Sequence, residues 1–476
     1  MNREELKKLT KEELIEILLA MTSKIAELTI EVTELKARLN QNSKNSSKPP
    51  SSDAYNKPKN HRKPSGKKPG AQYGHEGSGF KLAQEPDEYI AHNPKECIQC
   101  PKYMECQAEK EVNETRYEID IDIATTTTAH QSMKVKCPET QEALTGNFPE
   151  YITGRIQYGA NLKALAVSLN TYGTVSIDRT HEILSGVFGV PISTGTIASM
   201  VSDCAKKVEP TVNEIKEAIL EEPVAGFDET GTRVNKKTFW AHVASTGCLT
   251  YIGISPKRGK RGMDSIGILP NYYGKAIHDC WASYFLYLDI VHGLCNAHLL
   301  RELIAVLENE KQAWAQELMD LLLEMKATKE ALILEGQTEA LPGLLEEFIF
   351  EYDEILAQAL SENPVPEPDP MTKKKPKRGK AGALVDRLFL RKDQYLLFFT
   401  DFSVPFDNNQ AERDFRMFKV KQKVSGCFRT LDGAIDFANV FSFISTARKK
   451  GISAFVAIRD VFLGQPFSVK ANVQSE

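Results

Sequence analysis

The sequence predicts a multidomain α/β protein, and three observations support this prediction. The chain has 476 residues, which is too long for one ordinary domain. Residues 12–39 carry a heptad repeat of apolar residues, which predicts a long helix. After residue 222 the pattern changes to three strand-like runs, and stretches with helical spacing follow. We therefore expect a helical N-terminal part and a mixed sheet-and-helix core.

The N-terminal helix is expected to form a parallel two-stranded coiled coil. One apolar residue in each heptad comes from Leu14, Met21, Leu28 and Leu35, and the second comes from Leu18, Ile25, Val32 and Leu39. β-Branched residues in the second set, with mostly leucine in the first, favour a dimer. The alternative is an amphipathic helix that packs on its own domain.

A basic segment follows this helix. Residues 40–75 contain eight Lys or Arg residues but one acid, Asp53, although the net charge of the whole chain is only −4. The segment is rich in Ser, Pro, Asn and Gly, so it cannot bury enough apolar surface to fold alone. Its charges could neutralise DNA phosphates, although a solubilising linker is the alternative. The candidate phosphate contacts are Lys57, Lys59, Arg62, Lys63, Lys67 and Lys68.

Four cysteines lie within one short region, at Cys97, Cys100, Cys106 and Cys137. A C-x2-C pair can bind one zinc ion from a tight turn, and the chain begins without an apolar signal core that would favour disulfides. The second half of the site is weak, because no further cysteine follows Cys137 closely. Bound Zn²⁺ and a similar fold without metal both remain open.

Residues 155–206 read as helices. The helix from Ile177 to Phe188 should end at Gly189, and Ser193 or Thr194 should cap the next helix through Ala205. This arrangement fits a helix-turn-helix and a plain helical hairpin equally well.

Two acids lie at the ends of expected strands. The runs 224–234, 238–246 and 248–255 predict an antiparallel meander, and Asp228 should lie at or just beyond the exit of the first strand. A helix near Met263–Leu269 and a short strand ending at Asp279 follow. A meander, a helix and a further strand, with acids at neighbouring strand ends, predict a ribonuclease H-like core.

A third acid, Glu412, lies on a helix that Asp407 or Asn408 can cap. Four residues of this helix form one stripe, namely Glu412, Arg416, Lys419 and Lys423. Phe415 and Phe418 should anchor the helix to the sheet. Three converging carboxylates can hold two Mg²⁺ (or Mn²⁺) ions, which is the chemistry that phosphodiester cleavage needs.

Several segments resemble hallmarks of transposases of the insertion sequence 66 family. They are QNSKNSSKPPSSD at 41–53, GHEG at 74–77, FGVPISTGTIA at 188–198, FDETG at 227–231, CNAHLLREL at 295–303 and DNNQAERDFR at 407–416. The resemblance implies a leucine zipper, a zinc-finger-like DNA-binding domain and a DDE catalytic domain. It identifies the catalytic, metal-binding acids as Asp228, Asp279 and Glu412. The family's second cysteine pair is reduced to Cys137 here, which leaves zinc binding open.

The resulting domain prediction has six parts. These are a coiled coil at 1–40, a basic arm or linker at 41–84, a zinc-finger-like domain at 85–150, a helical part at 151–222, a ribonuclease H-like DDE domain at 223–440 with a helical insertion at about 300–390, and a C-terminal segment at 441–476. His298 and Arg301 begin the insertion, and we expect them to support the active site rather than only to pack or to bind metal. Trp281 should pack next to Asp279, and His278 should be structural.

The expected function is DNA transposition in the cytoplasm, in association with the nucleoid. The expected partners are terminal inverted repeats and target DNA, contacted through the basic arm and through Arg413, Arg416, Lys419 and Lys423, together with a second copy of the chain. The resemblance also implies small accessory proteins of the same element. No long apolar run predicts a membrane span. A non-catalytic DNA-binding repressor and a ribonuclease H-like nuclease without strand transfer are the alternatives.

Overall fold

The computed structural model describes residues 10–46, 53, 85–109, 111–121, 123–139, 141–365 and 378–469. It divides into two units, of which one is Lys59–Ala124 and the other comprises Met1–Pro58 and Thr125–Glu476. The six basic residues expected to contact DNA between 57 and 68 lie outside the described residues. The division at Thr125 falls inside the predicted zinc-finger-like segment, so its two parts are described separately.

The described part of the small unit has little regular structure. It contains a short helix and a 3₁₀ turn, α3 (Lys95–Ile98) and η2 (Tyr103–Glu105), and neither buries a residue. In the large unit, β1 (Lys134–Lys136) and β2 (Ala143–Thr145) form an antiparallel hairpin whose strand residues are all exposed.

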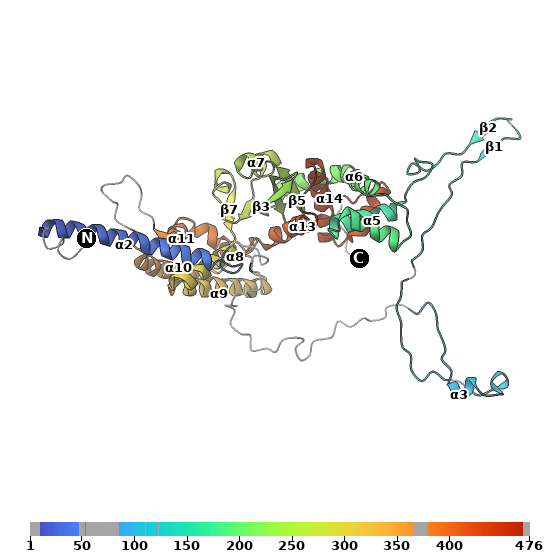
Figure 1. The fold of residues 1–476 in the computed structure, drawn as a ribbon, viewed down its shortest axis with the longest axis horizontal. Coiled ribbons are helices and arrows are strands. Elements are labelled where there is room, and N and C mark those ends of the chain that lie inside the picture. Colours follow the sequence, from blue (N-terminus) through green and yellow to red (C-terminus); the bar gives the residue numbers. More distant parts are fainter. Residues whose placement is uncertain are drawn as a thin grey trace. The chain divides into compact units, whose positions relative to one another are not determined.

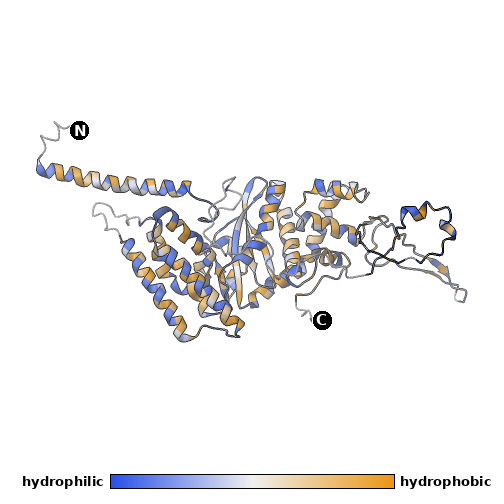
Figure 2. Cartoon of the chain, turned by 90° about the horizontal axis from the view of Figure 1, so that it is seen from below, coloured by the Kyte–Doolittle hydropathy of each residue, from blue (hydrophilic) through white to orange (hydrophobic). Residues whose placement is uncertain are grey.

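The N-terminal helix α2 (Lys11–Leu39) confirms the predicted helix (Figures 1 and 2). Thr10 caps it, because its hydroxyl accepts from the Glu13 N–H while the Glu13 carboxylate accepts from the Thr10 N–H. Most of the apolar seam is exposed, with Leu18, Ile25 and Leu39 at 62%, 60% and 87% exposure. The C-cap and the segment after the helix contact the insertion, where Asn40 Nδ2 donates to Asn309 Oδ1 at 3.2 Å and Asn45 Nδ2 donates to Glu308 at 2.6 Å.

A five-stranded mixed sheet forms the centre of the large unit, in the order β5-β4-β3-β6-β7. Its strands are β3 (Val224–Val234), β4 (Lys237–Ser245), β5 (Thr250–Ser255), β6 (Lys275–His278) and β7 (Val291–Leu294). The first three form the predicted antiparallel meander, whereas β6 and β7 run parallel to β3. Asn235 and Lys236 both have positive φ, as a tight hairpin turn between β3 and β4 requires.

Helices cover both faces of this sheet. One face packs against Ile215 and Ile219 at the end of α6 (Thr194–Glu221) and against Met263 of α7 (Lys260–Ile266). The other packs against the phenylalanines of α13 (Asn409–Ser425) and α14 (Leu431–Lys449). A short 3₁₀ turn, η4 (Leu269–Asn271), connects α7 to the next strand.

The helices before the sheet share a core with the C-terminal helices. This cluster joins α4 (Ala160–Val167), α5 (Ile177–Gly186) and α6 with α14 and α15 (Ala454–Phe462), and η3 (Ser168–Tyr172) follows α4. Ser193 caps α6, which continues past the expected end at Ala205 to Glu221 because its face remains apolar. The predicted boundary at residue 440 falls inside α14.

Five helices of the described ranges lie between β7 and α13, where the helical insertion was predicted. They are α8 (Asn296–Glu310), α9 (Trp314–Leu334), α10 (Pro342–Glu362), α11 (Gly379–Leu390) and α12 (Lys392–Thr400). These helices build their own apolar core, which reaches the sheet at Ile277 and Leu294. None of the helices in the described ranges combines the length and apolar character needed to cross a membrane.

Candidate active site

Asp228 and Asp279 are brought side by side by the register of two parallel strands. Gly226 of β3 pairs with Ile277 of β6, and each acid lies two residues further along its own strand direction. The expectation that Asp228 lies at a strand exit is wrong, since β3 continues to Val234. The reason is that β3 keeps pairing with β4 on its other side after its pairing with β6 has ended.

The environment of Asp228 disfavours its negative charge. Burial raises the pKa of Asp228 well above its usual value, and the nearby carboxylates of Glu229, Asp279 and Glu412 act in the same direction. These contributions place the three predicted acids within electrostatic reach of one another. Hard carboxylate oxygens at such a convergence fit a divalent cation, which would offset their mutual repulsion.

Helix α13 brings Glu412 close to Asp228 and Asp279. The Asn408 side chain donates a 2.8 Å hydrogen bond to the Phe227 carbonyl, next to Asp228. The approach is so close that a Cβ added at Gly226 would lie 2.2 Å from Asn408 Oδ1. Asn408 is the N-cap, as expected, but it is the Asp407 carboxylate that accepts from the Asn409 N–H. Glu412 therefore lies in the first turn of a helix fixed to β3.

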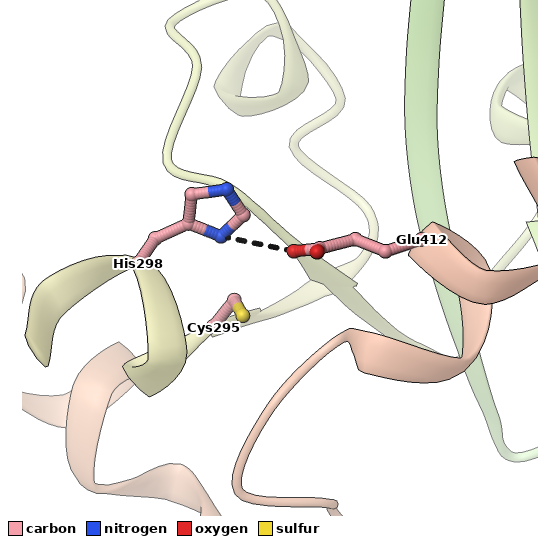
Figure 3. A group of neighbouring side chains, drawn as sticks. All are labelled: Cys295, His298 and Glu412. Carbon is pink, nitrogen blue, oxygen red and sulfur yellow. Dashed lines mark ion pairs between the residues drawn. The ribbon is translucent and has the colours of Figure 1, made fainter. Parts of the chain in front are cut away.

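The Glu412 carboxylate faces the start of α8. His298 Nδ1 lies 3.6 Å from Glu412 Oε1 (Figure 3). Arg301 Nη2 lies 3.6 Å from Glu412 Oε2. Among the described residues, the group of potential ligand atoms that all lie within 4.8 Å of one another is Cys295, His298 and Glu412. The three acids Asp228, Asp279 and Glu412 do not meet that spacing. His298 and Arg301 thus contact the third acid.

Glu229 is a fourth acid at this site that the sequence reasoning missed. Tyr284 donates to it at 2.6 Å, and Arg258 Nη2 lies 2.8 Å from its other oxygen. Burial raises the pKa of Glu229 to about 7, the charge of Asp279 acts in the same direction, and the hydrogen bonds from Tyr284 and Arg258 oppose them. The alternation of side chains along a strand could have predicted this, because Glu229 follows Asp228 directly and must face the opposite, buried side of β3.

Arg258 lies between two tryptophans. Its guanidinium carbon is 4.1 Å from the ring centre of Trp281 and 5.0 Å from that of Trp240. The backbone N–H of Trp281 donates to Asp279 Oδ1 at 3.0 Å, while the Trp281 ring contacts Arg258 and Tyr284. This stack places a partly exposed cation next to the acids.

His278 is a buried component of the sheet. Its Nε2 lies 3.0 Å from His292 Nδ1, and its ring stacks on Tyr284 at 4.4 Å. Burial lowers the pKa of His278 well below its usual value, and His292 and Arg391 contribute to the shift. A neutral, fully enclosed imidazole agrees with the structural role expected for this residue.

The basic residues of the α13 stripe lie on the surface, and so does the neighbouring Arg413. Arg413, Arg416, Lys419 and Lys423 are exposed, whereas Phe415 and Phe418 are buried against the sheet as expected. Lys419 is the member closest to the acids, because its ammonium donates to the Gly231 carbonyl at 2.9 Å and interacts with the charge of Asp228. An exposed cationic face thus extends from the acids along the helix.

Asp414, the neighbour of this stripe, anchors α13 from the inside. Its carboxylate accepts from Ser245, Thr250 and Lys449, all at 2.7 to 2.9 Å. The sequence reasoning did not single it out, although helical periodicity places Asp414 about 200° around the helix from Glu412, on the side of the buried Phe418.

The candidate zinc ligands lie in two separately described units. Cys97, Cys100 and Cys106 are exposed in the small unit, and Cys137 is half-buried in the large one. Zinc binding by these four cysteines stays a prediction.

Comparisons with known proteins identify the family. Residues 155–436 match the model of the Transposase IS66 family, and residues 1–81 match a family of unknown function (DUF6444). No curated protein matched the chain. Because the first match covers more than half of the 476 residues and includes all three predicted acids, the chain belongs to the IS66 family of transposases.

Proposed function

We propose that the protein is a DDE-type DNA transposase that binds the inverted repeats at the ends of its element and catalyses metal-dependent DNA cleavage and strand transfer. The observation that carries the proposal is the parallel register of β3 and β6, which aligns Asp228 with Asp279, while Asn408 ties the helix of Glu412 to the same strand.

The proposed catalytic core is ribonuclease H-like. The strand order β5-β4-β3-β6-β7, with an antiparallel meander followed by two parallel strands, supports this assignment. The helical insertion α8–α12 enters between the last strand and α13, so it contributes His298 and Arg301 beside the third acid.

Asp228, Asp279 and Glu412 would hold two Mg²⁺ or Mn²⁺ ions. Bound there, the ions supply activation of a water or 3′-hydroxyl and stabilisation of the leaving oxygen. The chain's own contribution is positional. Two of the acids are fixed by the sheet, and Glu412 is directed by its contacts to Arg301 and His298.

The exposed cations of α13 are the proposed DNA contacts near the acids, namely Arg413, Arg416, Lys419 and Lys423. We propose that the basic arm adds phosphate contacts outside the described residues, and that DNA binding associates the protein with the nucleoid. The helices α5 and α6 fit either a helix-turn-helix or a structural hairpin, and the sharing of their core with α14 and α15 favours the structural role.

Removing each acid tests the catalytic assignment. We expect Asp228→Ala, Asp279→Ala and Glu412→Ala each to abolish strand transfer on inverted-repeat DNA, while end binding measured by gel shift stays near the wild-type level. Glu209→Ala, at an exposed position of α6, is the matched control. Normal strand transfer by any of the three variants would show that its acid is wrongly assigned.

The two alternative functions give different products. A DNA-binding repressor would bind the ends without any Mg²⁺-dependent nicking. A nuclease without transfer activity would nick them but yield no covalently joined DNA. The burial of Asp228 beside further carboxylates favours a catalytic role over a repressor role. Such an arrangement destabilises the fold, and strongly shifted pKa values of this kind cluster at functional sites.

We also propose that the protein is a dimer through α2, and that accessory proteins of the same element assist it. The exposed apolar seam supports the dimer, since a second copy would bury it. Ile25→Glu combined with Val32→Glu should yield monomers in analytical ultracentrifugation. Glu16→Ala, on the outer face of the same helix, should leave the dimer intact. A monomeric wild type would contradict the proposal.

A further inference from the structure

A thiol, an imidazole and a carboxylate converge where α8 and α13 begin. Cys295 is the N-cap of α8, His298 lies in its first turn, and Glu412 lies in the first turn of α13. One ligand atom from each lies within 4.8 Å of the others (Figure 3). Two elements that are distant in the sequence thus present three metal-binding atoms to one point.

Two of these atoms have no hydrogen-bond partner. His298 Nδ1 and Glu412 Oε1 are both buried, and at 3.6 Å they are too far apart to bond to each other. Leaving one buried polar atom without a hydrogen bond destabilises the protein by about 1–3 kcal/mol. A third group bound between the two atoms would therefore be stabilising. A cation that accepts electron pairs from both atoms satisfies both at once.

The positions of the three residues are set by the backbone. The Cys295 N–H donates to the His278 carbonyl at 2.9 Å, and the Asn408 N–H donates to Cys295 Sγ at 3.1 Å. Asn296, which follows Cys295, bonds through its backbone N–H to the Phe406 carbonyl and through its side chain to the Tyr395 carbonyl. The start of α8 is therefore tied to β6 and to the segment before α13, and the cluster is largely preformed.

The donor set selects the kind of ion. Thiolate and imidazole favour Zn²⁺ and similar transition metals, whereas Mg²⁺ prefers an all-oxygen set. Zinc bonds of about 2.0–2.3 Å require ligand atoms roughly 3.5 Å apart, so the cluster needs only a small contraction. Arg301 contacts the other oxygen of Glu412 and leaves Oε1 available for the ion.

We propose that Cys295, His298 and Glu412 bind one zinc-class divalent cation. Three protein ligands leave a fourth position for water. Because Glu412 is also the third acid of the proposed magnesium site, an ion here holds one of its oxygens at the start of α8. The proposal concerns metal binding by the protein without DNA, so it does not depend on transposition.

Cobalt binding tests the site directly. The full-length protein should carry Cys97→Ser, Cys100→Ser, Cys106→Ser and Cys137→Ser, which removes the candidate finger ligands. Titration with Co²⁺ alone should produce a thiolate-to-cobalt charge-transfer band and the intense visible bands of four-coordinate cobalt. Added Zn²⁺ should remove these bands, whereas Mg²⁺ should not.

Variants assign the signal to the three residues. In the same background, Cys295→Ser should abolish the charge-transfer band, and His298→Gln should weaken Co²⁺ binding by about tenfold or more. Cys248→Ser, at an exposed cysteine, should leave the spectrum unchanged. Absence of the band in the background protein overturns the proposal, and so does its persistence in Cys295→Ser. If Cys295→Ser does not fold, unchanged binding by His298→Gln overturns it instead.

The outcome is separable from that of the proposed function. Loss of strand transfer in the acid variants together with no cobalt band would leave a transposase without this site. A cobalt band in the background protein, together with normal strand transfer by Glu412→Ala, would instead support the metal site and contradict the assignment of the third acid.

Discussion

Arg258 forms a salt bridge with Glu229, with Nη2 2.8 Å from Oε1, so the cation held between Trp240 and Trp281 partly neutralises the acid next to Asp228. The side chain of Glu229 is 1% exposed, and that of Arg258 is 41% exposed. One end of this pair is therefore fixed in the core, while the other is accessible beside the candidate active site.

Arg258→Ala should impair DNA cleavage without blocking end binding. The change removes the ring contact of Trp281, whose backbone N–H donates to Asp279, and leaves Glu229 with only Tyr284 as a donor. Loss of such a supporting partner typically lowers activity by about 10- to 100-fold. Nicking of inverted-repeat DNA in Mg²⁺ measures the effect, with Arg261→Ala, an exposed neighbour, as control. Equal nicking by both variants would contradict the supporting role.

Asp414→Ala should destabilise the fold strongly. It leaves the buried ammonium of Lys449 without its carboxylate partner at 2.9 Å and removes the acceptor of Ser245 and Thr250. Breaking a buried pair in this way costs about 3–5 kcal/mol. Glu330→Ala, which disrupts an exposed pair with Lys326, should cost at most about 1 kcal/mol. Urea unfolding compares the two variants, and a similar loss in both would refute the anchoring role of Asp414.

Lys421 should make stability depend on pH in the alkaline range. Its ammonium is buried and donates to the Asn170 carbonyl at 3.0 Å, and burial lowers its pKa from 10.5 to about 8. The unfolded chain therefore binds more protons than the folded one between these values, so stability should rise as pH increases through that window. The contribution is at most roughly 3 kcal/mol.

The test for Lys421 compares wild type with Lys421→Met across this range. The unfolding free energy of the variant minus that of wild type should be larger at pH 7 than at about pH 10. Only wild type gains stability as the ammonium deprotonates. Chemical denaturation at several pH values gives both curves. Parallel curves would mean that the ammonium is not perturbed in the folded protein.

Arg416→Ala and Lys423→Ala should weaken DNA binding with little regard to DNA sequence. Each exposed cation that neutralises a phosphate contributes roughly 0.9 to the slope of log affinity against log salt concentration. Both substitutions together should therefore reduce that slope by roughly 1.8. Lys311→Ala, an exposed position in the insertion, is the control. An unchanged salt slope in the double variant would exclude these two residues from the DNA interface.

Local sequence patterns were sufficient for the elements. The heptad residues predicted α2, period-two runs predicted β3 to β5, and Leu-rich helical spacing predicted the insertion, because each signal is carried by residues close in sequence. The same patterns predicted Asp228, Asp279 and Glu412 as the catalytic acids, and this assignment stays a prediction. They also assigned Phe415 and Phe418 to the buried side of α13, which the structure confirms.

Only the tertiary structure decided which side chains meet. The register of β3 against β6 aligns Asp228 with Asp279, and the missing Cβ of Gly226 admits Asn408. Hydrogen bonds between the start of α8 and the residues before α13 bring Cys295 and His298 to Glu412. Nothing local encodes these contacts, since their partners lie tens to hundreds of residues apart in the chain. The sequence by itself determined the elements and the chemistry they carry, whereas long-range strand pairing and core packing determined where that chemistry converges, because free energy from burial is gained only when distant segments close on one another.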